Sequence, residues 1–263
     1  MNPRRKTRLA VLLSGRGSNF VALADALARG TLGAEIVLVI SNRRSAGGLA
    51  AARARGIPTL VLAAGTGDRR QRNDRRLADT LRAAAVDWVC LAGYLRMIGP
   101  AVVAAFPQRI LNIHPSLLPA FPGLDAVRQA LAYGVSVTGC TVHLVDGGLD
   151  SGPIVLQRAV CVEAGDDEAS LAARILVQEH QAYAEALRRL LVDAWHLEGR
   201  RLVFAPPPPG RSSREKDEKG LTRPSGLSSI RLPRGATPGD SLNAHRPAGL
   251  PPRRIEPKGP SRR

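Results

Sequence analysis

Aromatic residues are scarce in this chain, and only 3% of its 263 residues are Phe, Trp or Tyr. The hydrophobic core must therefore be built from Leu, Val, Ile and Ala, for which a hydrophobic share of 44% is sufficient. Long apolar runs are also missing, which excludes a segment of about 20 residues that could span a membrane. The short run 9–13 after the basic start is too short for the core of a signal peptide.

Cysteine is rare as well, with three residues far apart at Cys90, Cys140 and Cys161. This odd number and wide spacing exclude a disulfide framework and the close spacing of a zinc site. Two of the three lie in apolar runs, which is typical of buried free thiols in a reducing compartment. We therefore predict a soluble cytoplasmic protein that binds no metal.

Charge is present in excess, at +16, but it is unevenly distributed. Residues 201–263 carry 14 Lys and Arg against 5 Asp and Glu, and Pro, Ser, Arg and Gly dominate from about residue 204. Such a segment cannot bury enough apolar surface to offset its ordering entropy. We predict a basic extension over 1–7, a folded domain over 8–203 and a disordered tail over 204–263, with no specific nucleic-acid partner.

Apolar stretches alternate with helical patterns through the first 200 residues. The predicted strands are 8–14, 36–40, 58–62, 86–93, 109–114, 138–145 and 154–162, and the main predicted helices are 20–27, 46–55, 69–85, 125–132 and 166–191. This order predicts an α/β fold with a doubly wound, mostly parallel sheet. The stretch 86–93 is apolar on both faces and belongs in the middle of that sheet.

A glycine turn follows the first predicted strand, with Gly15, Gly17, Ser18 and Asn19 ahead of a helix. Backbone N–H groups at a helix start can hold a phosphate. The turn has neither the Walker lysine nor a third glycine in dinucleotide register, so nucleoside triphosphates and NAD are poorly supported. A phosphate monoester site and a purely structural turn both remain open.

The strand 109–114 ends at Pro115 with Asn112 and His114 two residues apart. Because strand side chains alternate, these two point the same way, at the end of a parallel strand where ligands bind in such sheets. An amide and an imidazole together can hold a carbonyl oxygen and transfer a proton. The alternative is a polar strand end with a structural histidine.

Asp150 lies in a loop rich in Gly, flanked by turn formers that fix its direction. A carboxylate near an imidazole favours the protonated ring, and that ring with an amide N–H would stabilise an oxyanion. No Ser or Cys stands out as a nucleophile, and we expect Ser116 to bond the backbone of its own turn. The pattern thus favours direct acyl transfer between two bound molecules.

Three motifs together resemble the glycinamide ribonucleotide formyltransferase family. They are 112–119 with 121–124, the opening 14–19, and 138–143 with 149–154, and the resemblance runs in family order from about 8 to 197. It implies a Rossmann-like formyltransferase fold. It also implies direct formyl transfer, through a tetrahedral intermediate, from 10-formyltetrahydrofolate to the amine of 5'-phosphoribosylglycinamide in de novo purine (IMP) biosynthesis.

The resemblance also assigns roles by position. Asn112 would bind the formyl oxygen, His114 would donate a proton, and Asp150 would keep that histidine protonated and relay the amine proton through water. Gly17, Ser18, Asn19 and Glu179 would hold the ribonucleotide, while Arg70, Leu95, Arg96, Met97, Ile98 and Asn112 would hold the folate. Asp125 and Leu176 depart from the family pattern. We expect a monomer or homodimer.

Related activities form the main alternatives. A methionyl-tRNA formyltransferase shares the Asn-x-His centre but would be expected to carry a folded C-terminal RNA-binding domain. A formyltetrahydrofolate hydrolase would carry an additional N-terminal regulatory domain, whereas the first predicted strand here begins by residue 8. A non-catalytic nucleic-acid-binding protein, suggested by charge alone, would lose its affinity without residues 204–263.

Overall fold

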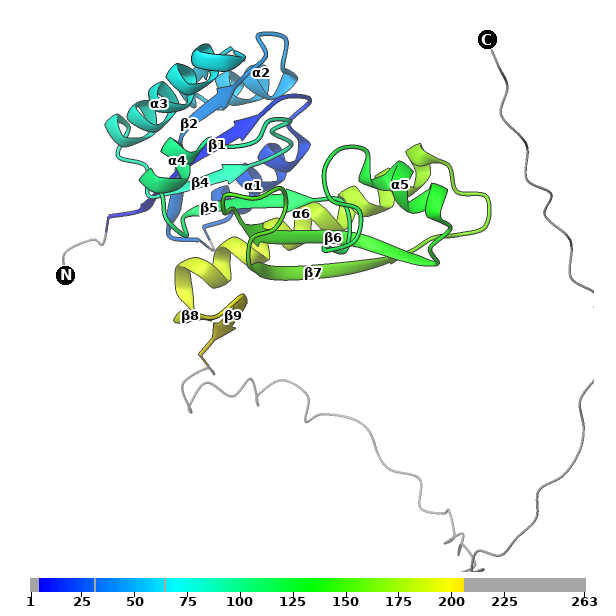
Figure 1. Ribbon diagram of the computed structural model, residues 1–263. Helices are drawn as coiled ribbons and strands as arrows, with labels where there is room; N and C mark the ends of the chain where they lie inside the picture. Colours follow the sequence, from blue (N-terminus) through cyan, green and yellow to red (C-terminus); the bar gives the residue numbers. More distant parts are fainter. Residues whose placement is uncertain (1–4, 31, 64, 206–263) are drawn as a thin grey trace, which may run out of the picture. The chain divides into compact units, whose positions relative to one another are not determined.

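The alternating pattern produces one seven-stranded sheet in the computed structural model, which describes residues 5–30, 32–63 and 65–205. The strand order is β3-β2-β1-β4-β5-β6-β7 (Figure 1). The strands are β1 (Thr7–Leu13), β2 (Ala34–Ser41), β3 (Thr59–Val61), β4 (Trp88–Leu91), β5 (Ile110–His114), β6 (Val137–Leu144) and β7 (Ile154–Cys161). The pairings among β1 to β5 are parallel, whereas β6 pairs antiparallel with both of its neighbours, β5 and β7. The predicted fold class is confirmed.

Helices cover both faces of this sheet. They are α1 (Ser18–Ala28), α2 (Gly47–Ala54), α3 (Gly67–Ala83), α4 (Pro100–Ala105), α5 (Ala126–Tyr133) and α6 (Glu168–Val192). In β1, Leu9 and Val11 pack into the core under α1, α2 and α6, whereas Ala10 and Leu12 pack into a second core under α3 and α4. None of the described helices combines the length and the apolar composition needed to cross a membrane.

The direction of strand order changes between β1 and β4, because β2 and β3 lie to one side of β1 and β5 lies beyond β4. The central position predicted for the stretch 86–93 is confirmed, since β4 pairs with both β1 and β5. At the carboxyl ends of these strands begin the glycine turn, the loop 93–98 and the turn after His114. Such a switch point is where open α/β sheets bind ligands.

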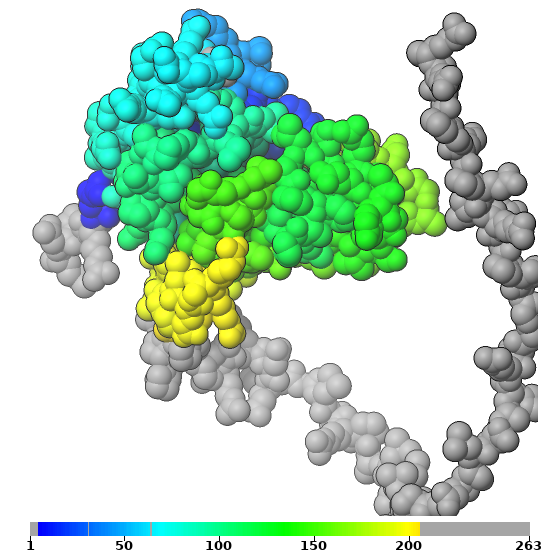
Figure 2. Space-filling view, viewed as in Figure 1, coloured from blue at the N-terminus to red at the C-terminus, as the bar shows by residue number. Residues whose placement is uncertain are grey.

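A C-terminal hairpin was absent from the sequence prediction. It comprises β8 (Trp195–Glu198) and β9 (Arg201–Phe204), and Figure 2 shows it in yellow against the green part of the chain that includes β7. The Trp195 ring lies 6.4 Å from that of Trp88, and the Arg189 guanidinium lies 3.7 Å from the Phe204 ring. The hairpin is held by this packing. Its two strands have only four residues each, which is too short for their periodicity to predict them.

The described elements begin before residue 8 and end after residue 203, the predicted bounds of the folded domain. Phe204 belongs to β9 and the Ala205 N–H donates to the Ala194 carbonyl, so the ordered part extends past 203. Thr7 already belongs to β1, and Arg5 forms a 2.7 Å ion pair with Asp87. The remaining residues of the two predicted segments, 1–4 and 206–263, lie outside the described residues.

Candidate active site

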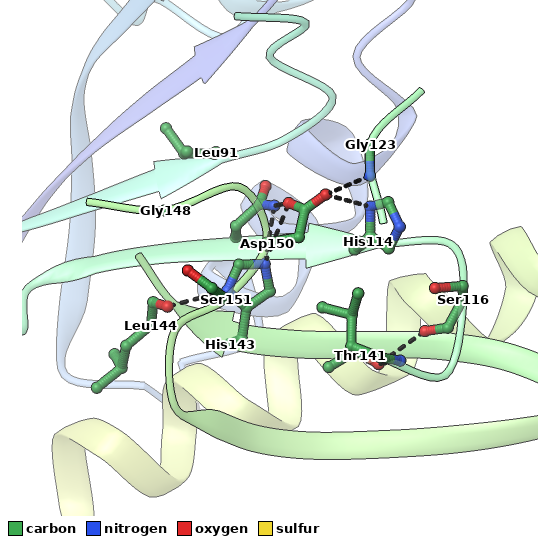
Figure 3. A network of polar contacts seen from close by, with 12 residues as sticks. Leu91, His114, Ser116, Gly123, Thr141, His143, Leu144, Gly148, Asp150 and Ser151 are labelled. Carbon is green, nitrogen blue, oxygen red and sulfur yellow. Dashed lines mark hydrogen bonds and ion pairs between the residues drawn. The ribbon is translucent and has the colours of Figure 1, made fainter. Parts of the chain in front are cut away.

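Asn112 and His114 project from one face of β5 and meet Asp150, which lies in the loop between β6 and β7. Figure 3 shows His114 facing Asp150. The His114 Nδ1 atom lies 3.4 Å from Asp150 Oδ2. The Asn112 Nδ2 atom lies 3.4 Å from Asp150 Oδ1. The three side chains predicted to act together are therefore brought together.

Asp150 is held rigidly in this cluster. Its backbone is left-handed, at φ 46°, and its Oδ2 accepts a 2.8 Å hydrogen bond from the Gly123 N–H. Burial alone would raise the pKa of this carboxyl, but the neighbouring His143 ring, the hydrogen bond from the Gly123 N–H and the charge of His114 hold the pKa below its usual value. The cluster therefore contains a carboxylate that is ionised at neutral pH.

His114 is 5% exposed, and both of its ring nitrogens face acceptor oxygens. Its Nε2 lies 2.8 Å from the Phe121 carbonyl oxygen, while Nδ1 faces Asp150. A ring protonated on both nitrogens donates to both acceptors. Ser116 donates to the Ala120 carbonyl at 2.6 Å, which confirms that its hydroxyl bonds the backbone of its turn.

His143 also belongs to the cluster, and sequence reasoning missed it. It is the antiparallel partner of Asn112 across β5 and β6. Its Nδ1 lies 2.9 Å from the Leu144 carbonyl oxygen, so Nδ1 carries the proton in the neutral ring and Nε2 accepts from Asn112 Nδ2 at 3.1 Å. Its place beside Asn112 depends on the pairing of β6 with β5, which periodicity alone does not reveal.

A cavity of about 480 Å³ opens beside the cluster. The predicted site residues that line it are Asn19, Leu95, Arg96, Met97, Ile98, Asn112, His114, Asp150 and Glu179; Gly17, Ser18 and Arg70 are not among the lining residues. Large apolar side chains line it in exposed positions, with Leu95 53% and Leu124 68% exposed. Exposed apolar side chains beside a polar cluster suit a ligand with a flat apolar ring and polar substituents.

The glycine turn brings two helix starts together. Gly17 caps α1 in a left-handed conformation at φ 81°, and a Cβ atom there would lie 2.7 Å from the Cα of Gly48 in α2. Only glycine fits this position, and Gly17 is the N-cap of α1 although Ser18 and Asn19 are the residue types that usually cap helices. The turn therefore presents free backbone N–H groups of the kind that hold phosphate.

Asn19 instead points to α6, where its Nδ2 donates to Glu179 Oε2 at 2.7 Å. Both residues are buried, and burial raises the pKa of the Glu179 carboxyl despite the hydrogen bond from Asn19. The Asn19 Oδ1 atom is buried and has no hydrogen-bond partner among the described residues. The two residues place hydrogen-bonding groups at the end of the cavity nearest α1.

Two further predicted positions lie at its margin. Arg70 is exposed on α3, one turn before the buried Asp74, whose pKa burial raises against the opposing charges of Arg96 and Arg70. Asp125 lines the cavity in a left-handed conformation, and its carboxylate is paired with Arg128. Among the described residues no three His, Cys, Asp or Glu side chains group together as a metal site would.

Because this cleft holds an amide, an imidazole and a carboxylate at the switch point of a parallel sheet, it suits an enzyme that transfers a group between two bound molecules. The chain belongs to the formyl transferase family, whose model matches residues 7–187.

Its relatives have consistent names. Phosphoribosylglycinamide formyltransferase of Escherichia coli is 43% identical over 192 residues, which are 73% of this chain and 88% of that protein. Trifunctional purine biosynthetic protein adenosine-3 of Drosophila pseudoobscura pseudoobscura is 46% identical over 72% of this chain, which spans only 14% of that protein. The crystal structure of glycinamide ribonucleotide transformylase 1 from Symbiobacterium toebii gives a TM-score of 0.74 at 47% identity, covering 76% of this chain and 95% of that one.

A formyltetrahydrofolate deformylase from Pseudomonas syringae shares the fold at greater distance. Its TM-score is 0.72 at 25% identity, covering 77% of this chain and 67% of that one. The relatives that share this sheet therefore include proteins named as formyltransferases and one named as a deformylase.

Proposed function

We propose that this protein transfers a formyl group from 10-formyltetrahydrofolate to the amine of 5'-phosphoribosylglycinamide, in de novo purine (IMP) biosynthesis. The observation that carries the proposal is the convergence of Asn112, His114 and Asp150 on one cavity. Ser116 is bonded to its own turn, so the attacking atom comes from a substrate. The names of relatives at 43–47% identity support the same substrates.

The reaction is a direct transfer through a tetrahedral intermediate. The amine nitrogen adds to the formyl carbon, and the electron pair of the carbonyl bond moves to the oxygen. Asn112 gives up its long contact to Asp150 and protonated His114 gives up its contact to the Phe121 carbonyl, and the two N–H groups stabilise that oxyanion. When the oxyanion collapses, the bond from carbon to the folate nitrogen breaks and His114 donates the proton that this nitrogen takes up. Asp150 accepts the proton of the attacking amine through a water molecule.

The two substrates occupy opposite ends of the cavity. Backbone N–H groups of Gly17, Ser18 and Asn19 hold the phosphate of the ribonucleotide, and Glu179 contacts its ribose. The segment 95–98 holds the folate ring, with Asn112 at its formyl end. Arg70 is not among the lining residues, so its contact with the folate rests on the family resemblance alone.

We further propose that the protein acts in the cytoplasm, as a monomer or homodimer and without a metal. Free thiols at Cys90, Cys140 and the exposed Cys161 support a reducing compartment.

An acceptor comparison tests the proposed function. The protein is given 10-formyltetrahydrofolate with 5'-phosphoribosylglycinamide, with methionyl-tRNA, or with water alone, and product formation is followed for each. We expect turnover with the ribonucleotide only. Equal folate consumption without any acceptor would establish a hydrolase, as in the deformylase relative, and would overturn the proposal.

A further inference from the structure

Ser14 is a buried serine that the proposed mechanism does not use. It follows β1 directly, is 1% exposed, and is not among the residues that line the cavity. Its hydroxyl oxygen accepts a 2.9 Å hydrogen bond from the Leu95 N–H and donates a 2.7 Å hydrogen bond to Asn42 Oδ1. Its own N–H donates to the Gly93 carbonyl at 3.0 Å.

These three bonds join the ends of three neighbouring strands. Ser14 follows β1, Asn42 follows β2, and the loop 93–98 follows β4, and these strands lie side by side in the order β2-β1-β4. Ser14 therefore holds the loop 93–98 at two backbone positions, Gly93 and Leu95. The side-chain amide oxygen of Asn42 orients the hydroxyl proton of Ser14, which leaves a lone pair of the Ser14 oxygen aimed at the loop.

Tyr94 and Ile98 pack against the core under α3 and α4, and they hold the two ends of the loop. Its middle is less well packed, since Leu95 and Met97 are 53% and 48% exposed. A backbone hydrogen bond inside the loop, from the Arg96 N–H to the Tyr94 carbonyl, shapes the turn without attaching it to the sheet. The buried hydroxyl of Ser14 is thus a principal attachment of the loop.

The glycine turn, by contrast, has a separate attachment. The Gly48 N–H of α2 donates to the Gly15 carbonyl at 3.2 Å, and Gly17 packs directly on Gly48. Loss of the Ser14 hydroxyl would therefore release the loop at Leu95, while the backbone bond from Ser14 to Gly93 and the glycine turn stay in place.

We propose that Ser14, oriented by Asn42, is a positioning residue that fixes the folate-binding loop against the central strand. This inference rests on the proposed function, in which the segment 95–98 holds the folate. Ser14 acts through the backbone of Leu95 and does not touch either substrate. Its removal consequently affects the binding of one substrate and leaves the transfer chemistry intact.

The test is the Ser14→Ala variant with steady-state kinetics for each substrate. Leaving a buried N–H without a partner is a cost that corresponds to about tenfold in binding. We expect KM for 10-formyltetrahydrofolate to rise about tenfold, while kcat and KM for the ribonucleotide stay within about twofold. The Asn42→Ala variant should show a smaller rise of the same KM, and the double variant should be no worse than Ser14→Ala alone.

Ser41→Ala provides the matched control. Ser41 is also fully buried at a strand end, and its hydroxyl accepts from the Arg43 N–H at 3.0 Å, away from the loop 93–98. We expect this variant to leave KM for the folate unchanged even if its melting temperature falls. If KM for the folate and KM for the ribonucleotide rise equally, and do so in the Ser14 variant as in the Ser41 variant, Ser14 is only a structural residue. That result would overturn the proposal.

The outcome also separates the two proposals. If the natural protein formylates the ribonucleotide but Ser14→Ala and Asn42→Ala keep its KM for the folate, only the role of Ser14 fails. If the natural protein does not turn over the ribonucleotide, the proposed function fails, and calorimetric titration with 5-formyltetrahydrofolate still measures the loop. Tighter folate binding by the natural protein than by Ser14→Ala would then support the role of Ser14, and equal binding would overturn it.

Discussion

Replacing Asp150 by Asn removes one charge from the cluster while preserving its shape. Asp150 has a left-handed backbone at φ 46°, which Asn tolerates and Ala does not. The amide oxygen of Asn can still accept from the Gly123 N–H. The change therefore isolates the carboxylate charge better than Asp150→Ala, which would add backbone strain.

The size of the effect follows from the 3.4 Å separation between His114 Nδ1 and Asp150 Oδ2. At an effective dielectric constant of about 20, opposite charges at that distance attract by about 5 kcal/mol. Desolvation of this largely buried pair offsets part of the attraction and leaves about 3 to 4 kcal/mol. Since each 1.4 kcal/mol is about a factor of ten, kcat should fall by about 10²- to 10³-fold.

The assay is the initial rate of ribonucleotide formylation, with kcat and both KM values measured for Asp150→Asn. The matched control is Asp79→Asn, which removes an exposed carboxylate paired with Arg82 on α3, and its kcat should stay within about twofold of the natural protein. Retention of more than about one third of kcat by Asp150→Asn would remove the carboxylate from the mechanism.

Three further predictions concern the surroundings of the cluster. His143→Ala should lower kcat about tenfold, because Asn112 loses the acceptor that orients its amide; rates of the purified variant check this, and unchanged rates would make His143 structural. Tyr183→Phe should destabilise the fold by about 1–3 kcal/mol in urea unfolding, since the buried hydroxyl donates to the carbonyls of both Leu91 and Leu111; no change in midpoint would contradict this. Glu179→Gln should stabilise the fold at neutral pH, because the raised pKa of Glu179 means that its charged form opposes folding. That gain should be absent below about pH 4 and grow as pH rises, so a constant difference in melting temperature across pH would contradict it.

The sequence predicted the elements whose signal is local. Strand alternation alone placed Asn112 and His114 on one face, and the break at Pro115 placed them at the carboxyl end of β5. The two-sided apolar pattern of 86–93 correctly predicted a central strand. Asp150 was predicted from the turn formers that flank it, and the family resemblance agreed, although its distance from His114 along the chain hides their direct contact.

What the sequence could not predict depends on contacts between distant segments. His143 joins the cluster only because β6 pairs with β5 in an antiparallel register. Asn19 is a residue type that often caps helices, but its side chain donates to Glu179, which lies 160 residues later in the chain. Here a tertiary contact outweighs the local preference. The β8–β9 hairpin is stabilised by packing on Trp88 and Arg189, which no local pattern records.

The hairpin also determines on which side of the domain the two ends of the described chain lie. Thr7 opens β1 and Trp88 opens β4, so both mark the amino ends of parallel strands, and Trp195 in β8 packs on Trp88. The last described residue, Ala205, is bonded to the neighbour of Trp195. The first and last described segments of the chain therefore lie at the amino ends of the parallel strands, whereas the cavity opens at their carboxyl ends. A domain with this arrangement can be part of a longer polypeptide without the adjoining segments blocking the opening of the cavity. The trifunctional relatives are longer polypeptides of this kind.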